Sequence, residues 1–167
     1  MGCALMLAHL GARKTADKMY SFNTQNKLMM LEQCHELEEA NQLADEILVQ
    51  NKEFFAPYSV KAQYCYAAGD FGAMIQYEKE ALARNPFQYS EYEAYCKMLM
   101  VGISLYEQEG DRQSADFCKQ ELLAVSKQLQ ENIQRLSTFG KMIKDQPTTV
   151  LSEEVRRFIE QNGGRAG

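Results

Sequence analysis

Long runs of helix-forming residues, broken by a few turn residues, are the feature that most constrains this sequence. Between Asn23 and Ser137 the chain is rich in Ala, Leu, Gln, Glu, Lys and Met, which favour helix. The runs are interrupted at Pro57, Gly69-Asp70, Asn85-Pro86 and Gly110-Asp111. No run alternates apolar and polar residues over the length of a strand, so we expect no sheet. The predicted helices lie at about 24–35, 38–51, 58–68, 71–84, 89–109, 112–137 and 152–161.

Two of the interruptions are Gly-Asp turns, each placed between two long helical runs. A connection of two residues makes the neighbouring helices antiparallel, so each turn predicts a helical hairpin. Helical hairpins that repeat at a period of about 34 residues are typical of a solenoid. We therefore expect an all-α fold, a superhelix of about three α-α hairpins followed by a C-terminal helix.

The best copy of the hairpin runs from Phe55 to Pro86 and resembles a tetratricopeptide repeat. Its matching positions are Tyr58, Ala62, Gly69-Asp70-Phe71, Ile75, Tyr77, Ala81, Leu82 and Pro86. Its departures from the repeat are Lys61, Cys65, Met74 and Glu78. Weaker copies flank it, one around the Gly110-Asp111 turn and one around 39–48. The resemblance is therefore to a degenerate tetratricopeptide-like array.

The order of four segments gives a second, closer resemblance. They are ANQLADEIL at 40–48, the GDF repeat, RNPFQYSEYEAYCKMLM at 84–100 and RLSTFGKMIKDQP at 135–147. Together they resemble the soluble helical domain of O-antigen ligase/polymerase-like membrane proteins of Gram-positive anaerobes, over about 21–160. In those proteins tetratricopeptide-like hairpins follow a multispanning region that handles glycans. The resemblance implies membrane attachment and a cell-envelope polysaccharide pathway, with any catalytic residues in the membrane part.

The N-terminal segment 2–12 is apolar and is followed by Arg13, Lys14 and Lys18. It has about half of the ~20 residues needed to span a bilayer, and no basic residues precede it as in a signal peptide. It fits an ordinary first helix or the end of a span that begins upstream. After such a span, the basic residues favour the cytoplasmic face. Without one, the chain would be a soluble cytoplasmic protein.

These features divide the chain into four parts. They are an apolar N-terminal helix or span remnant at 1–20, the repeat domain at 21–138, an extension with a short helix at 139–162, and a tail at 163–167.

Composition and motifs argue against several classes of function. The net charge of −5 argues against a nucleic-acid partner. Five scattered cysteines without a CxxC pair and only two histidines give no reason to expect a disulfide framework, a metal site or a cofactor. Cys34 and His35 are adjacent, but neighbours on a helix do not face each other, so we assign no catalytic residues. A small helical enzyme that uses Glu78 or Glu93 is the alternative from another class.

The first helices of tetratricopeptide hairpins line the concave groove, which is where we expect a protein or peptide partner. The repeat register places Ser59, Gln63, Tyr66 and Ala67 of one hairpin and Lys97, Met100, Ser104 and Glu107 of the next on this face. The partner-binding residues predicted from it are Ser59, Gln63, Tyr66, Lys97, Met100 and Ser104. Their mixed character, without clustered lysines or arginines, favours an apolar or mixed helical partner. A homodimer is a second arrangement.

Three tyrosines at the start of the predicted helix 89–109 have two interpretations. Tyr89, Tyr92 and Tyr95 are spaced so that they share a helix face. They pack this long helix on its neighbours, or they form an exposed surface that recognises a peptide or a sugar ring. The sequence therefore predicts a non-catalytic scaffold, the soluble tail of a larger membrane protein or a stand-alone adaptor, with a sugar-binding module as a less favoured reading.

Overall fold

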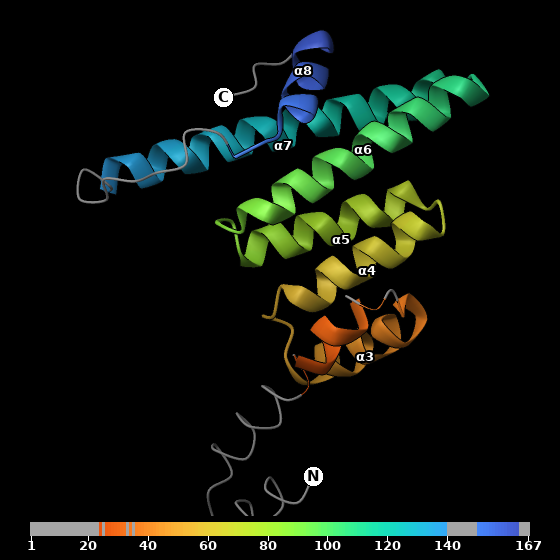
Figure 1. The fold of residues 1–167 in the computed structure, drawn as a ribbon, viewed down its shortest axis with the longest axis vertical. Coiled ribbons are helices and arrows are strands. Elements are labelled where there is room, and N and C mark those ends of the chain that lie inside the picture. Colours follow the sequence, from red (N-terminus) through yellow and green to blue (C-terminus); the bar gives the residue numbers. More distant parts are fainter. Residues whose placement is uncertain (1–23, 25, 33, 35, 140–149, 164–167) are drawn as a thin grey trace, which may run out of the picture. The chain divides into compact units, whose positions relative to one another are not determined.

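The computed structural model describes residues 24, 26–32, 34, 36–139 and 150–163, with side chains omitted for 136–139 (Figure 1). Over these residues the regular structure is helical, which confirms the all-α prediction. The expected N-terminal helix or span, His35, most of the segment 139–149 and the tail from 164 lie outside the described residues.

The observed helices follow the predicted ones closely. The first is a helical segment at 26–32. The others are α3 (Leu37–Gln50), α4 (Ala56–Ala67), α5 (Phe71–Arg84), α6 (Tyr89–Glu109), α7 (Arg112–Phe139) and α8 (Glu153–Gln161). Each described end lies within three residues of its expected position.

Each Gly-Asp turn ends one helix and begins the next. Gly69 and Gly110 have φ of 77° and 78°, the left-handed conformation that glycine adopts without strain after a helix C-terminus. The following aspartate caps the next helix: Asp70 Oδ1 accepts a hydrogen bond from the Ala73 N–H at 2.9 Å, and Asp111 Oδ1 accepts one from the Ser114 N–H at 3.1 Å. Two residues therefore suffice for each turn.

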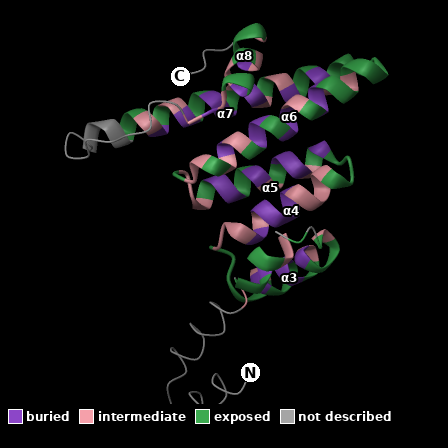
Figure 2. Ribbon diagram, viewed as in Figure 1, coloured by how far each residue is buried: buried purple, intermediate pink, exposed green. Residues whose placement is uncertain are grey.

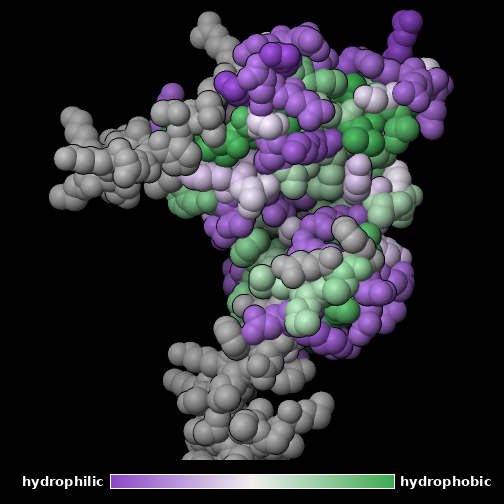
Figure 3. Space-filling model, in the orientation of Figure 1, coloured by the Kyte–Doolittle hydropathy of each residue, from purple (hydrophilic) through white to green (hydrophobic). Residues whose placement is uncertain are grey.

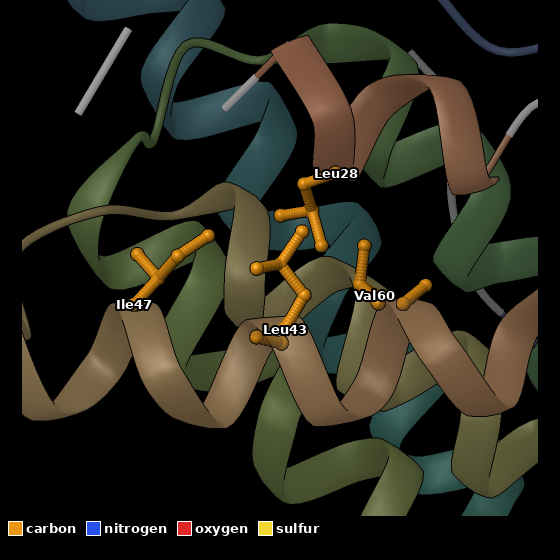
Figure 4. Packing of buried hydrophobic residues seen from close by; sticks show 6 residues of the cluster. Leu28, Leu43, Ile47 and Val60 are labelled. Carbon is orange, nitrogen blue, oxygen red and sulfur yellow. The ribbon is translucent and has the colours of Figure 1, made fainter. Parts of the chain in front are cut away.

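The chain divides into two compact units between Arg84 and Asn85, and this boundary falls inside the predicted repeat domain 21–138. The first unit contains α3, α4 and α5, and α4 packs against both of its neighbours. Its core brings together the helical segment 26–32, α3 and α4, where Leu28 and Leu43 point toward one another and Val60 lies beside them (Figure 4). Ala62 is fully buried, as expected for a small residue at a helix crossing.

Lys61 stands in the first unit where a tetratricopeptide repeat expects leucine. Its ammonium group is largely buried and is held by the Asp45 carboxylate at 2.7 Å and the Asn41 side-chain oxygen at 3.1 Å. It also lies 5.3 Å from the centre of the Tyr77 ring, close enough for a cation–π contact. The charge is tolerated because it is paired where it is buried.

The second unit is the α6–α7 hairpin with α8 packed against it (Figure 1). Leu99 and Ile103 of α6 are buried, as are Ala115 and Leu122 of α7, and the purple faces in Figure 2 follow this pattern. Near the turn, Lys119 Nζ forms an ion pair with Glu107 across the hairpin at 2.6 Å. The buried Leu151, Val155 and Ile159 hold the α8 segment in this unit.

Tyr92 and Tyr95 of α6 pack in the core, so the interpretation of an exposed recognition surface formed by Tyr89, Tyr92 and Tyr95 is wrong. Tyr92 and Tyr95 are essentially inaccessible, and Tyr89 is half-buried. The Tyr92 hydroxyl accepts a hydrogen bond from Asn132 of α7 at 2.8 Å and donates to the Pro86 carbonyl at 3.1 Å. Asn132 also donates to that carbonyl at 3.1 Å. This buried network joins the beginning of α6 to the far end of α7.

Replacement of Tyr92 by Phe is expected to destabilise the protein by about 1–2 kcal/mol, because one of the two N–H groups of the buried Asn132 amide loses its acceptor while the other keeps the Pro86 carbonyl. Urea denaturation followed by circular dichroism measures the loss. Tyr89→Phe is the matched control and is expected to change the free energy of unfolding by less than about 0.5 kcal/mol. Equal losses for the two variants would contradict a stabilising role for the network.

Candidate functional site

A groove of about 550 Å³ lies between α6 and α8 in the second unit. Its lining residues are Lys97, Met100, Val101, Ser104 and Leu105 of α6 and Glu154 and Phe158 of α8. In the same region hydrophobic side chains reach the visible surface among hydrophilic ones (Figure 3). Three of the predicted groove residues, Lys97, Met100 and Ser104, are therefore brought together in one depression.

The α6 wall of the groove is one stripe of the helix. Residues spaced three and four apart lie on the same helix face, and the five lining positions of α6 follow this spacing. The opposite face of α6 is used by the core, where Leu99 and Ile103 are buried. Val101 and Leu105 remain 39% and 42% exposed, so the stripe presents apolar surface to solvent.

The α8 wall depends on how that short helix is capped and packed. Ser152 is its N-cap, and the Ser152 hydroxyl accepts a hydrogen bond from the Val155 N–H at 3.5 Å. Val155 and Ile159 are one turn apart and fully buried. Packing of this face leaves Glu154 and Phe158, also one turn apart, to line the groove.

Glu93 links the two walls. One oxygen of its carboxylate accepts a hydrogen bond from the backbone N–H of Ser152 at 3.0 Å, and the other forms an ion pair with Lys97 Nζ at 2.9 Å. Burial alone would raise the pKa of Glu93, but the hydrogen bonds from Ser152 and Lys97 outweigh it and lower the pKa below its ordinary value. The hydrogen bond to Glu93 raises the pKa of Lys97, so both groups are charged at neutral pH.

Most polar groups of the groove already have partners. The Ser104 hydroxyl donates to the Met100 carbonyl within α6 at 3.0 Å, and Lys97 is paired with Glu93. Among the described residues the Glu154 carboxylate has no ion-pair partner and interacts with Lys97 only at longer range. Pockets for small molecules usually present several convergent polar groups to the ligand. An apolar stripe beside one uncompensated carboxylate suits a protein segment better than a sugar ring.

The other three predicted groove residues lie in the first unit and are engaged there. Ser59 is only 7% exposed because α4 packs against helices on two sides, so it is not available to a partner. Gln63 donates a side-chain hydrogen bond to the Glu32 carboxylate at 2.5 Å. The Tyr66 ring packs edge-on against Phe71, with ring centres 5.9 Å apart.

Four lining residues were not predicted from the sequence: Val101, Leu105, Glu154 and Phe158. Extending the spacing from Lys97 and Met100 along the same helix face would have found the first two. The two α8 residues have no such signal, because their place depends on tertiary packing.

The two glutamates of the enzyme alternative, Glu78 and Glu93, lie in different units. Glu78 of α5 is fully buried in the first unit, and Glu93 of the second is held by Lys97 and Ser152. Among the described residues, no three His, Cys, Asp or Glu side chains are grouped so as to hold a metal ion. No described helix has both the length and the apolar character needed to cross a bilayer.

No protein-family model, curated protein or solved structure matches this chain.

Replacement of Glu93 by Ala is expected to lower the melting temperature at pH 7 by about 3 °C, for a loss of about 1 kcal/mol when both contacts disappear. The pKa of Glu93 is lowered by folding, so its stabilisation is complete above the ordinary value of 4.5 and is lost as the pH falls through the folded-state pKa. The gap between wild type and variant should therefore close in acid. Melts followed by circular dichroism from pH 7 to pH 3 measure it.

Glu109→Ala provides the matched control, because it removes a carboxylate from the exposed end of α6, where Glu109 has no ion pair among the described residues. Its melting temperature should equal that of the wild type at pH 7. A gap for Glu93→Ala that widens as the pH falls would contradict the assigned role of Glu93.

Proposed function

We propose that this chain is a non-catalytic protein–protein interaction domain whose α6–α8 groove binds a segment of a partner protein. The observation that carries the proposal is the meeting of Lys97, Met100 and Ser104 with the exposed side chains of Val101 and Leu105 in one groove. Apolar side chains gathered at an exposed site with a polar rim are typical of protein-binding surfaces.

The tetratricopeptide-like repeat pattern also favours the groove-lining face of α6 as the binding face. In tetratricopeptide arrays the first helix of each hairpin lines the binding groove, and α6 is the first helix of the α6–α7 hairpin. The register counted back from Gly110 gives Lys97, Met100, Ser104 and Glu107, and the first three of these line the groove. Agreement between the register and the groove favours a binding role for this face.

The cellular setting of the proposal rests on the resemblance to O-antigen ligase/polymerase-like membrane proteins. In that setting the chain is the soluble tail of a larger membrane protein in cell-envelope polysaccharide assembly, and it holds a partner near the membrane. A stand-alone adaptor is the alternative, and it uses the same groove. The size of the native polypeptide distinguishes them, since the tail of a membrane protein belongs to a polypeptide much larger than 19.1 kDa.

A photo-crosslinking residue, p-benzoylphenylalanine, at position 101 tests the groove in source cells that produce the full chain. We expect one defined adduct, because Val101 is exposed within the groove. The adduct should disappear when Met100→Glu and Leu105→Glu are added, since two charges in an apolar groove oppose burial of a partner. Gel electrophoresis with an antibody to the chain detects it.

The control places the same photo-crosslinker at Gln128, an exposed position of α7 that does not line the groove. Circular dichroism establishes that each variant is folded. The proposal fails if position 128 gives the same adduct with equal yield, or if the two glutamates leave the adduct unchanged.

A further inference from the structure

We infer that the occupant of the α6–α8 groove is a basic amphipathic helix, one with a narrow apolar ridge flanked by lysine or arginine. The inference rests on the proposed function and adds the chemistry of the partner. It is carried by the shape of the groove and by the charges that line it.

The shape of the groove favours a helical ridge. Its apolar wall is a single stripe on α6, with Val101 and Leu105 one turn apart, and Phe158 of α8 faces the same depression. A helix presents side chains at positions i, i+3 or i+4, and i+7 as a ridge, and such ridges pack into grooves between side chains of other helices. A partner of this kind matches a groove bounded by two helices.

The charged side chains that line the groove are Lys97 of α6 and Glu154 of α8. Other carboxylates of the two helices are engaged elsewhere, since Glu107 pairs with Lys119 of α7 and Glu153 pairs with Arg157. Inside the groove the positive charge of Lys97 is balanced by Glu93 at 2.9 Å. The exposed carboxylate of Glu154 therefore gives the groove a surplus negative charge. A lysine or arginine beside the apolar ridge of the partner would pair with it.

The same charges disfavour a second copy of this chain as the occupant. In a symmetric dimer the same patch faces itself, so the Glu154 carboxylates of both copies would come together. The net charge of −5 on each copy adds to the repulsion. An acidic helix is disfavoured for the same reason.

The test measures binding of the full chain to two synthetic helical peptides at physiological salt. Both have the same leucine ridge, and they differ in having lysine or glutamate beside it. Fluorescence anisotropy of the labelled peptides should show binding of the lysine peptide about tenfold tighter than that of the glutamate peptide. Glu154→Lys should reduce this preference about fivefold, and Leu105→Glu should abolish binding of both peptides.

Glu131→Lys is the matched control, because it makes the same change in net charge at an exposed position of α7 outside the groove. Its preference should stay within twofold of the wild type. The inference is overturned if the glutamate peptide binds equally well, if neither peptide binds, if Glu131→Lys acts as strongly as Glu154→Lys, or if the chain alone dimerises through this face. If a groove adduct forms in cells but any of these results is obtained, the proposed function holds. Only the assignment of a basic helix as the partner is then rejected.

Discussion

The packing of α6 against α7 is the constraint on which the candidate site depends. One face of α6 is buried in the core of the hairpin and carries Tyr92, Leu99 and Ile103. Because of the helical period, the stripe with Val101 and Leu105 lies on another face of α6, which does not pack against α7. The groove arises because α8 covers only part of that remaining stripe.

Glu93 connects the structure of this unit with its charge. Its hydrogen bond from Ser152 fixes the beginning of α8, and its ion pair with Lys97 neutralises the one positive charge of α6. The same carboxylate therefore positions the second wall of the groove and leaves Glu154 as its uncompensated charge. Loss of Glu93 would change both the shape and the electrostatics of the site.

Local signals predicted the helices and one wall of the groove, and tertiary packing decided the rest. The Gly110-Asp111 turn specifies the α6–α7 hairpin, and counting back from it located Lys97, Met100 and Ser104. The burial of Ser59 depends on the two helices that enclose α4, and the tyrosine spacing of α6 is the same whether the face is buried or exposed. Phe158 lines the groove only because α8 packs against this unit, and no local sequence pattern predicts that packing.

The most direct test of a binding face on α6 is a methyl NMR spectrum of the full chain during titration with the lysine-flanked helical peptide. We expect the resonances of Met100, Val101 and Leu105 to shift, while those of Met30 and Val49, which are exposed in the first unit, stay in place. Shifts confined to Met30 and Val49, or a spectrum in which the α6 methyl groups do not respond, would contradict a binding face on α6.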